Sequence, residues 1–413
     1  MVVWVLKDGE ILPIQEYGRR MRTWLLADAL LSRGHRVTWW ASTFSHQRKA
    51  LLFDRDQVFD VQRHFRLRLL ASGTYDRNVS LRRYLHHRRL GHRFLKVART
   101  LQPPDAIVCA FPVIDLAYYA ARYAKALRIP LVIDVRDLWP DTFLGKLPAG
   151  SRWLGRLLFA KDFRRAHYTC AAADSLVSIS QGCLDWGLTK AGRSARPADR
   201  VFHTGCPDAL TNAVLSRAPV RPEWSGKVLF TFVGSFGSSY NLRSICDVAE
   251  MCLAGGDDHV HFVLVGDGDQ YTDIVRRAVR LPNVTLTGWI GQEALTDLLK
   301  ASDVGMAPLR SVRDAMPNKP YEYFAAGLPI LSSLEGEMEA LLDQHDVGSS
   351  YRDGDVGRLR ELVLAFAADP TRRAACSRNA RALYESRFRA EDIYARYARH
   401  VEEVIGGDLR KVG

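Results

Sequence analysis

The residues that first suggest chemistry are two acids and a lysine in RDAMPNKPYEYFAAGLP, residues 313–329. Asp314 lies in a predicted loop, Lys319 follows a Pro-Asn pair, and Glu322 lies just inside a predicted helix. A carboxylate accepts two hydrogen bonds at once, which suits the neighbouring hydroxyls of a ribose or hexose. A lysine at a helix N-terminus suits a diphosphate, because its charge and the helix dipole act together. A capped helix with solvated charges is the plainer alternative.

The element that must position these residues is a helix at the carboxyl edge of a parallel sheet. Residues 303–308, DVGMAP, read as a strand, so Asp314 follows that strand on a loop. Asn318 or a neighbour is expected to cap the helix, whose early turn holds Pro320 and Glu322. The two acids and the lysine then face one crevice.

Two glycine-rich turns follow neighbouring predicted strands in the same half of the chain. The first turn holds Gly234 and Gly237 before a helix, where backbone N–H groups can approach an anion. The second turn holds Gly266. Plain tight turns are the simpler alternative for both. Asp267 and Asp269 form a D-x-D pair in the second turn, which fits a packed loop better than a metal pair.

Short apolar runs alternate with longer segments of helical periodicity, which is the pattern of parallel sheets wound with helices. The predicted strands are residues 2–6, 36–41, 65–70, 106–111, 131–135 and 175–180 in the first half, and 228–233, 260–265, 284–288, 303–308 and 329–333 in the second. The sequence therefore predicts an α/β protein of two tandem doubly wound, Rossmann-like domains, with ligands at the carboxyl ends of the strands.

The domain boundary is placed where the alternation stops. Residues 210–227 contain two prolines and show no clear periodicity, so we interpret them as a linker. The N-terminal domain is then 1–209 and the C-terminal domain is 228–387. An amphipathic helix at 388–405 follows the second sheet, and we expect it to pack back on the N-terminal domain.

Length and composition exclude several classes of protein. A chain of 413 residues is too long for one ordinary core. It has no apolar run of about 18 residues and no signal-peptide pattern at MVVWVLKDGE, so we expect a cytoplasmic protein. Its seven cysteines form no C-x-x-C pair, which argues against a zinc site and a disulfide framework.

The formal charge of +12 is concentrated in one segment. Residues 63–99 hold 11 Lys and Arg against one acid, a local charge of +10. Within residues 80–101 a helix is predicted with arginines on much of its surface. Its apolar side is expected to hold Leu81, Tyr84, Leu85, Phe94, Leu95, Ala98 and Leu101, and its polar face His86, His87 and His92.

Three partners fit this basic segment. An anionic membrane surface is favoured, since each basic residue near such a surface contributes about 1 kcal/mol. Nucleic acid binding needs only such charge, but it is the less expected partner. A solvated helix face is the plain alternative.

The D-x7-E spacing followed by YFAAGLP resembles the E-x7-E motif of the retaining family 4 glycosyltransferases, which have the GT-B fold. Further segments fall in the order of that family over nearly the whole chain. They are RGHRVTWW (33–40), LVIDVRDLWPD (131–141), ADSLVSIS (173–180), TFVGSFG (231–237), VLVGDGD (263–269), NVTLTGW (283–289) and DVGMAPL (303–309). The resemblance implies two Rossmann-like domains facing a cleft, with the acceptor bound by the first and a nucleotide sugar by the second.

The resemblance also implies roles for individual residues. Glu322 contacts the ribose of the donor, and Asp314 contacts its sugar ring. The implied catalytic set is Lys319, Asp314 and Arg243. The implied donor-binding set is Glu322, Asn318, Pro317, Met316, Gly234, Ser235, Phe236, Gly237 and Gly266. The implied acceptor set is Gly18, Arg19, Arg22, Arg136 and Asp137.

The sequence departs from the family pattern in three respects. The first acid is Asp314 instead of the usual Glu. The basic pair that many members carry after the first strand of the second domain is missing, which leaves Lys319 and the nearby Arg243, with Arg310 or Arg313 in reserve. No histidine follows the fourth strand, so no catalytic histidine is assigned.

The expected function is a metal-independent, cofactor-free, retaining glycosyltransferase. It moves a hexosyl or N-acetylhexosaminyl group from a nucleotide sugar, expected to be UDP-linked, to a lipid-linked or other cell-envelope glycan in polysaccharide biosynthesis. The expected place is the cytoplasm, with peripheral attachment to the membrane through residues 63–99. A nucleotide-sugar epimerase of the same fold and a non-catalytic basic protein that binds membrane or nucleic acid remain as alternatives.

Overall fold

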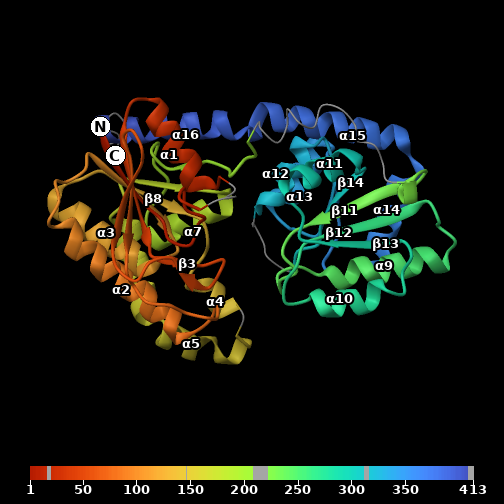
Figure 1. Cartoon of the computed structure of the whole chain (residues 1–413), viewed down its shortest axis with the longest axis horizontal. Helices are drawn as coiled ribbons and strands as arrows, with labels where there is room; N and C mark the ends of the chain where they lie inside the picture. The colour runs from red at the N-terminus through yellow and green to blue at the C-terminus, as the bar shows by residue number, and fades with distance from the viewer. Residues whose placement is uncertain (16–19, 146, 208–221, 311–315, 408–413) are drawn as a thin grey trace. The chain divides into compact units, whose positions relative to one another are not determined.

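The computed structural model describes residues 1–15, 20–145, 147–207, 222–310 and 316–407 (Figure 1). These residues form two compact units: unit 1 is Met1–His203 with Glu391–Gly413, and unit 2 is Thr204–Ala390. Most of the expected linker 210–227 lies outside the described residues, and Val228 begins the first strand of unit 2. Within the described ranges, no helix combines the length and hydropathy that a membrane span requires.

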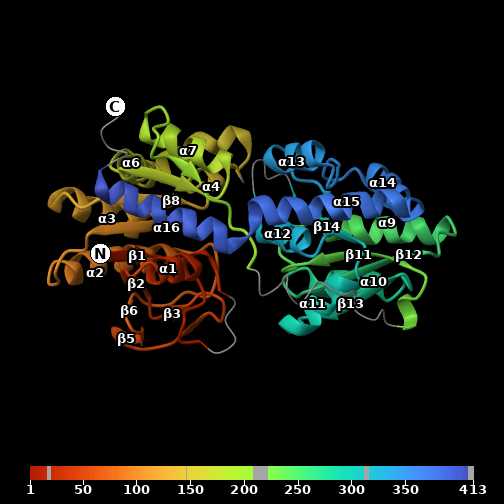
Figure 2. The same cartoon turned by 90° about the horizontal axis from the view of Figure 1, so that it is seen from above.

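Unit 1 is built on an eight-stranded sheet in the order β10-β9-β8-β7-β1-β2-β6-β5. Figure 2 labels five of these strands, β8, β1, β2, β6 and β5, in this order. Its strands are β1 (Val2–Leu6), β2 (Arg36–Ser42), β5 (Gln57–Gln62), β6 (Phe65–Leu70), β7 (Ala106–Phe111), β8 (Leu131–Val135), β9 (Ser175–Ser178) and β10 (Arg200–Val201), with β3 (Phe44–Ser45) and β4 (Ala50–Leu51) paired apart from them. Within the eight-stranded sheet the strands pair in parallel except for β5, which lies antiparallel on β6.

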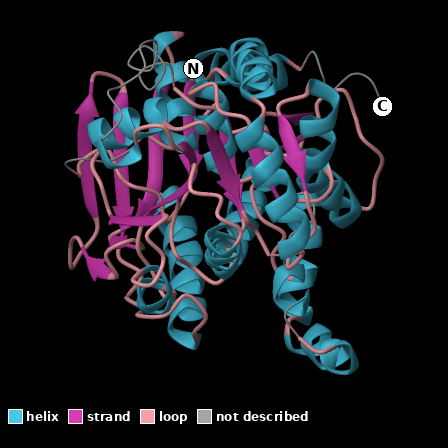
Figure 3. Ribbon diagram, turned by 90° about the vertical axis from the view of Figure 1, so that its right-hand side faces the viewer, coloured by secondary structure: helices cyan, strands magenta, loops and turns pink. Residues whose placement is uncertain are grey.

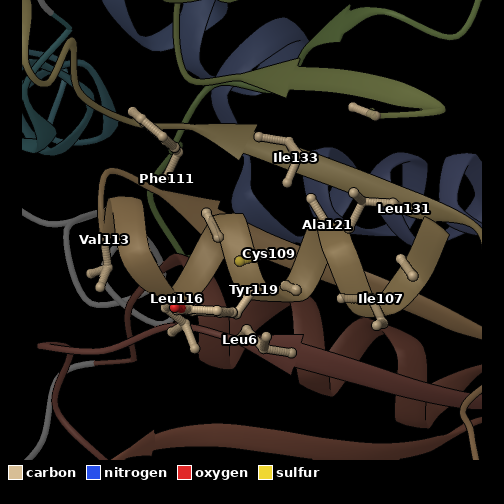
Figure 4. Packing of buried hydrophobic residues seen from close by; sticks show 14 of the residues in the cluster. Leu6, Ile107, Cys109, Phe111, Val113, Leu116, Tyr119, Ala121, Leu131 and Ile133 are labelled. Carbon is tan, nitrogen blue, oxygen red and sulfur yellow. The ribbon is translucent and has the colours of Figure 1, made fainter. Parts of the chain in front are cut away.

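The helices of unit 1 cover this sheet. They are α1 (Arg22–Ser32), α2 (Leu81–Ala98), α3 (Ile114–Leu127), α4 (Asp141–Gly145), α5 (Arg152–Leu158), α6 (Ala160–Ala171), α7 (Gln181–Ala191) and α16 (Ala390–Gly406). Figure 4 shows α3 lying on the buried strands β7 and β8. Gly91 of α2 allows a close approach to α3, because a Cβ at that position would lie 2.7 Å from the carbonyl oxygen of Asp115.

The C-terminal helix α16 packs in unit 1, as Figures 1 and 2 show. Tyr397 stacks on Phe202 with ring centroids 4.6 Å apart. Glu402 pairs with Arg33 at 2.6 Å and with His35 at 2.7 Å. Helix α16 is therefore held in unit 1 by both apolar and charged contacts.

Unit 2 is built on a parallel sheet in the order β13-β12-β11-β14-β15-β16. Its strands are β11 (Val228–Val233), β12 (Val260–Val265), β13 (Val284–Gly288), β14 (Val304–Ala307), β15 (Ile330–Ser332) and β16 (Gly348–Ser350). Its helices are α9 (Leu242–Ala254), α10 (Tyr271–Ala278), α11 (Gln292–Ala301), α12 (Asn318–Ala325), α13 (Glu337–His345), α14 (Val356–Ala368) and α15 (Pro370–Leu383), followed by a π-helical turn at Tyr384–Phe388.

Helices lie on both faces of the second sheet, and Figure 3 separates them from the strands by colour. Leu229 and Val233 of β11 belong to one hydrophobic cluster, whereas Phe230 and Phe232 belong to another. Because successive side chains of a strand point to opposite faces, this alternation shows that both faces of β11 are buried. The expected α/β class with two doubly wound sheets is confirmed.

The prediction of which α2 residues are exposed and which are buried is wrong at three positions. His86 and His87 are buried instead of belonging to the polar face, and Leu81 is 73% exposed instead of packed. His86 Nδ1 lies 2.8 Å from the carbonyl oxygen of Gly73, and its Nε2 lies 3.2 Å from Asp8. These partners come from other elements, so helical periodicity did not reveal them.

Candidate functional site

The connection order of unit 2 places a binding edge beside β11. The chain runs from β11 outwards through β12 and β13, and then returns to the other side of β11 as β14. Ligands of open parallel sheets bind outside the carboxyl ends of the strands at such a reversal. The loops that follow β11 and β14 therefore border the expected site.

The two glycine turns interlock at this edge. A Cβ on Gly266, whose φ is +136°, would lie 1.8 Å from the carbonyl oxygen of Gly234, so only glycine fits there. The N–H of Gly234 donates to Val265, and the N–H of Phe236 donates to Asp267 at 2.8 Å. The turns after β11 and β12 are thus fixed against each other by backbone contacts.

Tyr323 holds α12 against the same edge. Its buried hydroxyl accepts a hydrogen bond from the N–H of Val233 at 2.9 Å and donates to Met306 at 3.3 Å. Its ring packs on Gly305, where a Cβ would lie 2.6 Å from the ring. This helix residue therefore connects the ends of β11 and β14 and fixes the position of its neighbour Glu322.

Lys319 and Glu322 lie together at the beginning of α12. Lys319 Nζ is 3.1 Å from Glu322 Oε2, and the side chains are 23% and 4% exposed. Burial, followed by the charge of Glu322, raises the pKa of Tyr240, which follows the first glycine turn. The structure thus brings Lys319, Glu322 and the Gly237–Tyr240 turn to one edge. The helix begins at Asn318, so the N-cap residue is Pro317 and not the expected Asn318, and Pro317 makes no side-chain capping hydrogen bond.

Residues 227–369 match the family described as Glycosyl transferases group 1. This segment is a group 1 glycosyltransferase domain. A probable glycosyltransferase of Pseudomonas aeruginosa, WbjE, is 24% identical over 271 residues. The match covers 63% of this chain and 63% of the length of that relative.

Two solved structures show the fold of the whole chain. Sucrose-phosphate synthase from Thermosynechococcus elongatus is 16% identical, with a TM-score of 0.76 over 98% of this chain and 99% of that chain. Anabaena Alr3699/HepE in complex with UDP is also 16% identical, with a TM-score of 0.69 over 98% of this chain and 100% of that chain. The resemblance to the family 4 glycosyltransferases with the GT-B fold is confirmed.

Several expected donor contacts in the glycosyltransferase domain have other partners. Arg243 pairs with Asp273 of α10 at 2.8 Å on the surface, so its guanidinium is already engaged. The side chains of Phe236 and Met316 are buried in hydrophobic clusters, which gives them packing roles. Ser235 is exposed, and Pro317 is half-buried before α12.

Two expected residues of this domain, Asp314 and Arg313, lie outside the described residues. Arg310 is exposed, and its N–H donates to Ser239 at 2.8 Å.

The D-x-D pair of the glycosyltransferase domain lies in an exposed turn. Asp267 Oδ1 accepts a hydrogen bond from the N–H of Gly268 at 2.7 Å. Across the described ranges, no group of three or more His, Cys, Asp or Glu side chains is arranged to hold a metal ion.

The carboxyl edge of the unit 1 sheet holds a buried network of charges. Arg22 donates two hydrogen bonds of 2.9 Å to the carboxylate of Asp134. Arg136 donates to the same carboxylate at 2.8 Å and pairs with Glu10. Glu10 in turn accepts the N–H of Thr23 at the start of α1.

Electrostatics explain why these buried groups stay charged. Burial alone would raise the pKa of Asp134, but Arg136 and Arg22 lower it below its ordinary value. Burial opposes the charge of Arg22, yet Asp134 raises the pKa of that guanidinium. The expected acceptor residues Arg22 and Arg136 therefore belong to a buried ion-pair network. One buried nitrogen of Arg136, Nη2, has no hydrogen-bond partner among the described residues.

The other expected acceptor residues give a mixed result. Asp137 Oδ1 accepts from the N–H of Leu138 at 2.7 Å and from Thr142 at 3.2 Å, which shapes the turn after β8. Gly18 and Arg19 lie outside the described residues.

Sequence reasoning overlooked one residue at the carboxyl edge of the unit 2 sheet. Trp289 follows the last residue of β13 and is 80% exposed. The preceding residue, Gly288, accepts the N–H of Gly266, so Trp289 adjoins the second glycine turn. A large exposed aromatic at the end of a strand was the available signal.

Proposed function

We propose that this chain is a retaining glycosyltransferase that uses a UDP-linked sugar and a lipid-linked or other cell-envelope glycan acceptor. The observation that carries the proposal is the Lys319–Glu322 pair beside the interlocked glycine turns at the reversal of the unit 2 sheet. Anabaena Alr3699/HepE, which shares the fold, has been solved with UDP and with UDP-glucose, and this supports the choice of donor.

In the proposed mechanism, Glu322 binds the ribose hydroxyls and Lys319 binds the diphosphate. Their present ion pair then opens, so that each charge acquires a donor partner. The N-terminus of α12 adds its partial positive charge at the phosphates. Because the transition state develops negative charge on the leaving diphosphate, these groups stabilise the transition state more than the ground state. Trp289 lies at the same edge, and its exposed ring is a candidate stacking partner for the base.

The proposal keeps metal independence and retention of configuration. Lys319 and the helix terminus supply the charge that a divalent cation supplies elsewhere. The proton of the acceptor hydroxyl passes to the leaving phosphate oxygen during front-face attack, which requires no protein base. Donor turnover is therefore expected to persist in EDTA, and product analysis by NMR is expected to show the anomeric configuration of the donor.

The deciding experiment is a thermal-shift screen of UDP, GDP, ADP and their sugars. UDP and one UDP-sugar are expected to raise the melting temperature of the wild type, because a ligand that binds only the folded state stabilises it. Glu322→Ala is expected to remove this shift, since the ribose contact is lost. Glu335→Ala, which removes an exposed carboxylate of the same unit, is the matched control and keeps the shift.

Two outcomes contradict the proposal. One is the absence of stabilisation by every nucleotide, and the other is an unchanged shift in Glu322→Ala. Conversion of a UDP-sugar into its epimer without any acceptor assigns the chain to the epimerase alternative instead.

A further inference from the structure

Unit 1 contains an apolar pocket that neither the donor site nor the buried charge network uses. Its volume is about 540 Å³, within the usual range for ligand pockets. It opens beside the loops that follow β7 and β8 and is bordered by α2, α4, α5 and α6. Its apolar lining includes Val79, Leu81, Ile114, Trp139, Phe143 and Leu158.

Helix α5, next to this pocket, exposes its large apolar side chains instead of burying them. Gly155 faces inward, because a Cβ there would lie 2.6 Å from Leu144 and Leu147. A globular helix normally buries its apolar face. Here the large apolar side chains point outward, and the exposed ones are Trp153 (59%), Leu154 (52%), Leu157 (66%) and Leu158 (77%).

The other border of the pocket continues this apolar surface. Val79 and Leu81, which precede and begin α2, are 71% and 73% exposed. Leu158 lines the same pocket from α5, so both segments meet at its mouth. Exposed apolar residues scattered singly need no explanation, but a contiguous group of this kind marks an interaction surface.

Positive charge surrounds this apolar surface. Arg152 and Arg156 are exposed on α5, and Lys161 is exposed at the start of α6. Arg83 lines the pocket with its guanidinium 4.7 Å from the centre of the Trp139 ring.

The acids at the pocket are buried. Asp115 pairs with Arg165, and Asp162 lies nearby with one carboxylate oxygen that has no hydrogen-bond partner among the described residues. The exposed rim is therefore cationic.

We propose that α5 and the mouth of this pocket dock unit 1 on an anionic lipid bilayer, with hydrocarbon chains against α5 and in the pocket. Helices that lie in a membrane interface combine Trp and Leu on one side with basic residues beside them. Helix α5 has this composition, with arginine as its basic residue. The cationic rim meets lipid phosphates, which distinguishes this occupant from an apolar protein face. Docking here brings unit 1 to the membrane, where a lipid-linked acceptor is found. This inference depends on the proposed function only in taking the acceptor to be lipid-linked.

The proposed contact keeps Val79, Leu81 and Arg83 from the expected membrane-binding segment 63–99 and adds α5 to them. Arg66 pairs with Asp60 and Arg93 pairs with Asp56, so part of the charge of that segment is neutralised within the fold. The exposed apolar side chains gather at the N-terminal end of α2 and on α5 instead.

Sedimentation of the full-length chain with vesicles tests the surface. The wild type is expected to pellet with vesicles of phosphatidylcholine and phosphatidylglycerol at three to one, and much less with phosphatidylcholine alone. Leu157→Gln/Leu158→Gln is expected to weaken binding more than about tenfold, because apolar area no longer enters the bilayer. Arg152→Gln/Arg156→Gln is expected to weaken it roughly 30-fold, since two basic contacts are lost.

Matched controls carry equal changes elsewhere. Val279→Gln changes an apolar residue of unit 2 that is 81% exposed, and Lys96→Gln/Arg99→Gln changes two exposed charges at the far end of α2. Both controls are expected to bind like the wild type. The proposal is overturned if the leucine variant pellets like the wild type, if the Lys96/Arg99 variant loses binding equally, or if the leucine change abolishes a dimer without affecting vesicles.

Tryptophan fluorescence tests whether the apolar side chains of α5 insert into the bilayer. Vesicles of phosphatidylglycerol with brominated chains are expected to quench the tryptophan fluorescence of the wild type, and Trp153→Phe is expected to reduce that quenching. Glycerol phosphate, which has the headgroup chemistry without a chain, is expected not to release the protein. Quenching that is unchanged in Trp153→Phe contradicts insertion of α5. Stabilisation by UDP measured in the same variants is expected to persist, so failure of the membrane surface is distinguishable from failure of the donor site.

Discussion

At the carboxyl edge of the unit 1 sheet, Arg22 and Arg136 share the buried carboxylate of Asp134. At the same edge of the unit 2 sheet, two glycine turns interlock through their backbone, and Lys319 with Glu322 forms one ion pair beside them. Both edges occupy the position where parallel sheets bind ligands. The first edge pairs its charges with one another, although Nη2 of Arg136 is a buried nitrogen with no hydrogen-bond partner among the described residues. The second edge presents interlocked backbone turns and one ion pair.

The difference shows that charged residues at a sheet edge are not by themselves evidence of a ligand site. Burial of a charge is tolerated only when a partner compensates it, so Arg22 and Asp134 need one another. Glycine turns need no such partner, because their fixed backbone dipoles carry no net charge. We therefore expect the two edges to respond differently to substitution.

The largest expected effect is loss of the shared carboxylate in unit 1. Asp134→Ala leaves two buried guanidinium groups without their common partner and is expected to lower the free energy of unfolding by about 3–5 kcal/mol. Urea denaturation measures it. Glu335→Ala, which breaks the exposed pair with Arg352, is the control and is expected to cost less than about 1 kcal/mol. A loss below 1 kcal/mol in Asp134→Ala contradicts the structural role of the network.

The second largest effect on stability is expected from the backbone contact between the two glycine turns of unit 2. Gly266→Ala forces a Cβ against the carbonyl oxygen of Gly234 and is expected to cost about 2–4 kcal/mol, since steric crowding adds to an unfavourable φ. Gly354→Ala is the matched control, because its φ is +85° but nothing lies within 4 Å of the added Cβ. If both variants lose the same stability, the close approach of the two turns is not important.

A pH effect is expected from the buried histidine next to the unit 1 edge. Burial lowers the pKa of His87 to about 3, so the folded protein keeps this ring neutral while the unfolded chain takes up a proton below about pH 6.5. Stability is therefore complete above pH 6.5 and falls as the pH decreases towards 3. At pH 5 the expected loss from this residue is about 2 kcal/mol.

Unfolding by urea at pH 7 and pH 5 measures this loss. His87→Gln is expected to remove the contribution, and His64→Gln, which changes an exposed ring, is expected to leave it in place. An identical pH dependence in His87→Gln and the wild type means that burial does not control this proton.

The smallest effect on stability is expected at Trp289. Its side chain is 80% exposed, so Trp289→Ala is expected to change the free energy of unfolding by less than about 0.5 kcal/mol. Affinity for UDP, measured by calorimetry, is expected to fall by about 1–3 kcal/mol if the ring stacks on the base. Met251→Ala changes another exposed apolar side chain of unit 2 and is expected to affect neither quantity. Unchanged UDP affinity in Trp289→Ala removes this residue from the site.

Seven predicted strands coincide with observed strands. Three of them are β1, β6 and β13, of which β6 and β13 are only partly buried. The other four are buried along their whole length. The predicted ranges 106–111, 131–135, 228–233 and 260–265 coincide with β7, β8, β11 and β12, because a continuous apolar run bounded by polar residues is a local signal. The edge strand β5 at Gln57–Gln62 was missed. It alternates half-buried and exposed residues because β6 pairs with it, and that pairing is not local.

Part of the candidate site was also readable from residue types. Lys319 and Glu322 are one helical turn apart, so their proximity follows from helix geometry alone. The roles assigned to Arg22, Arg136 and Arg243 stay predictions, and each of these residues has an ion-pair partner far from it in the sequence. No local pattern shows which distant carboxylate an arginine will meet.

The sequence by itself determined the two doubly wound sheets, the glycine turns and the helix that carries Glu322. Apolar periodicity, the backbone freedom of glycine and helix geometry all depend on residues close together in the chain. They can therefore be recognised from short stretches of sequence. Only the tertiary structure decided which charges are buried together, which histidines lose contact with water and which face of α5 remains exposed. Desolvation and packing depend on everything that surrounds a side chain, and in this chain the partner of Arg22 lies 112 residues away.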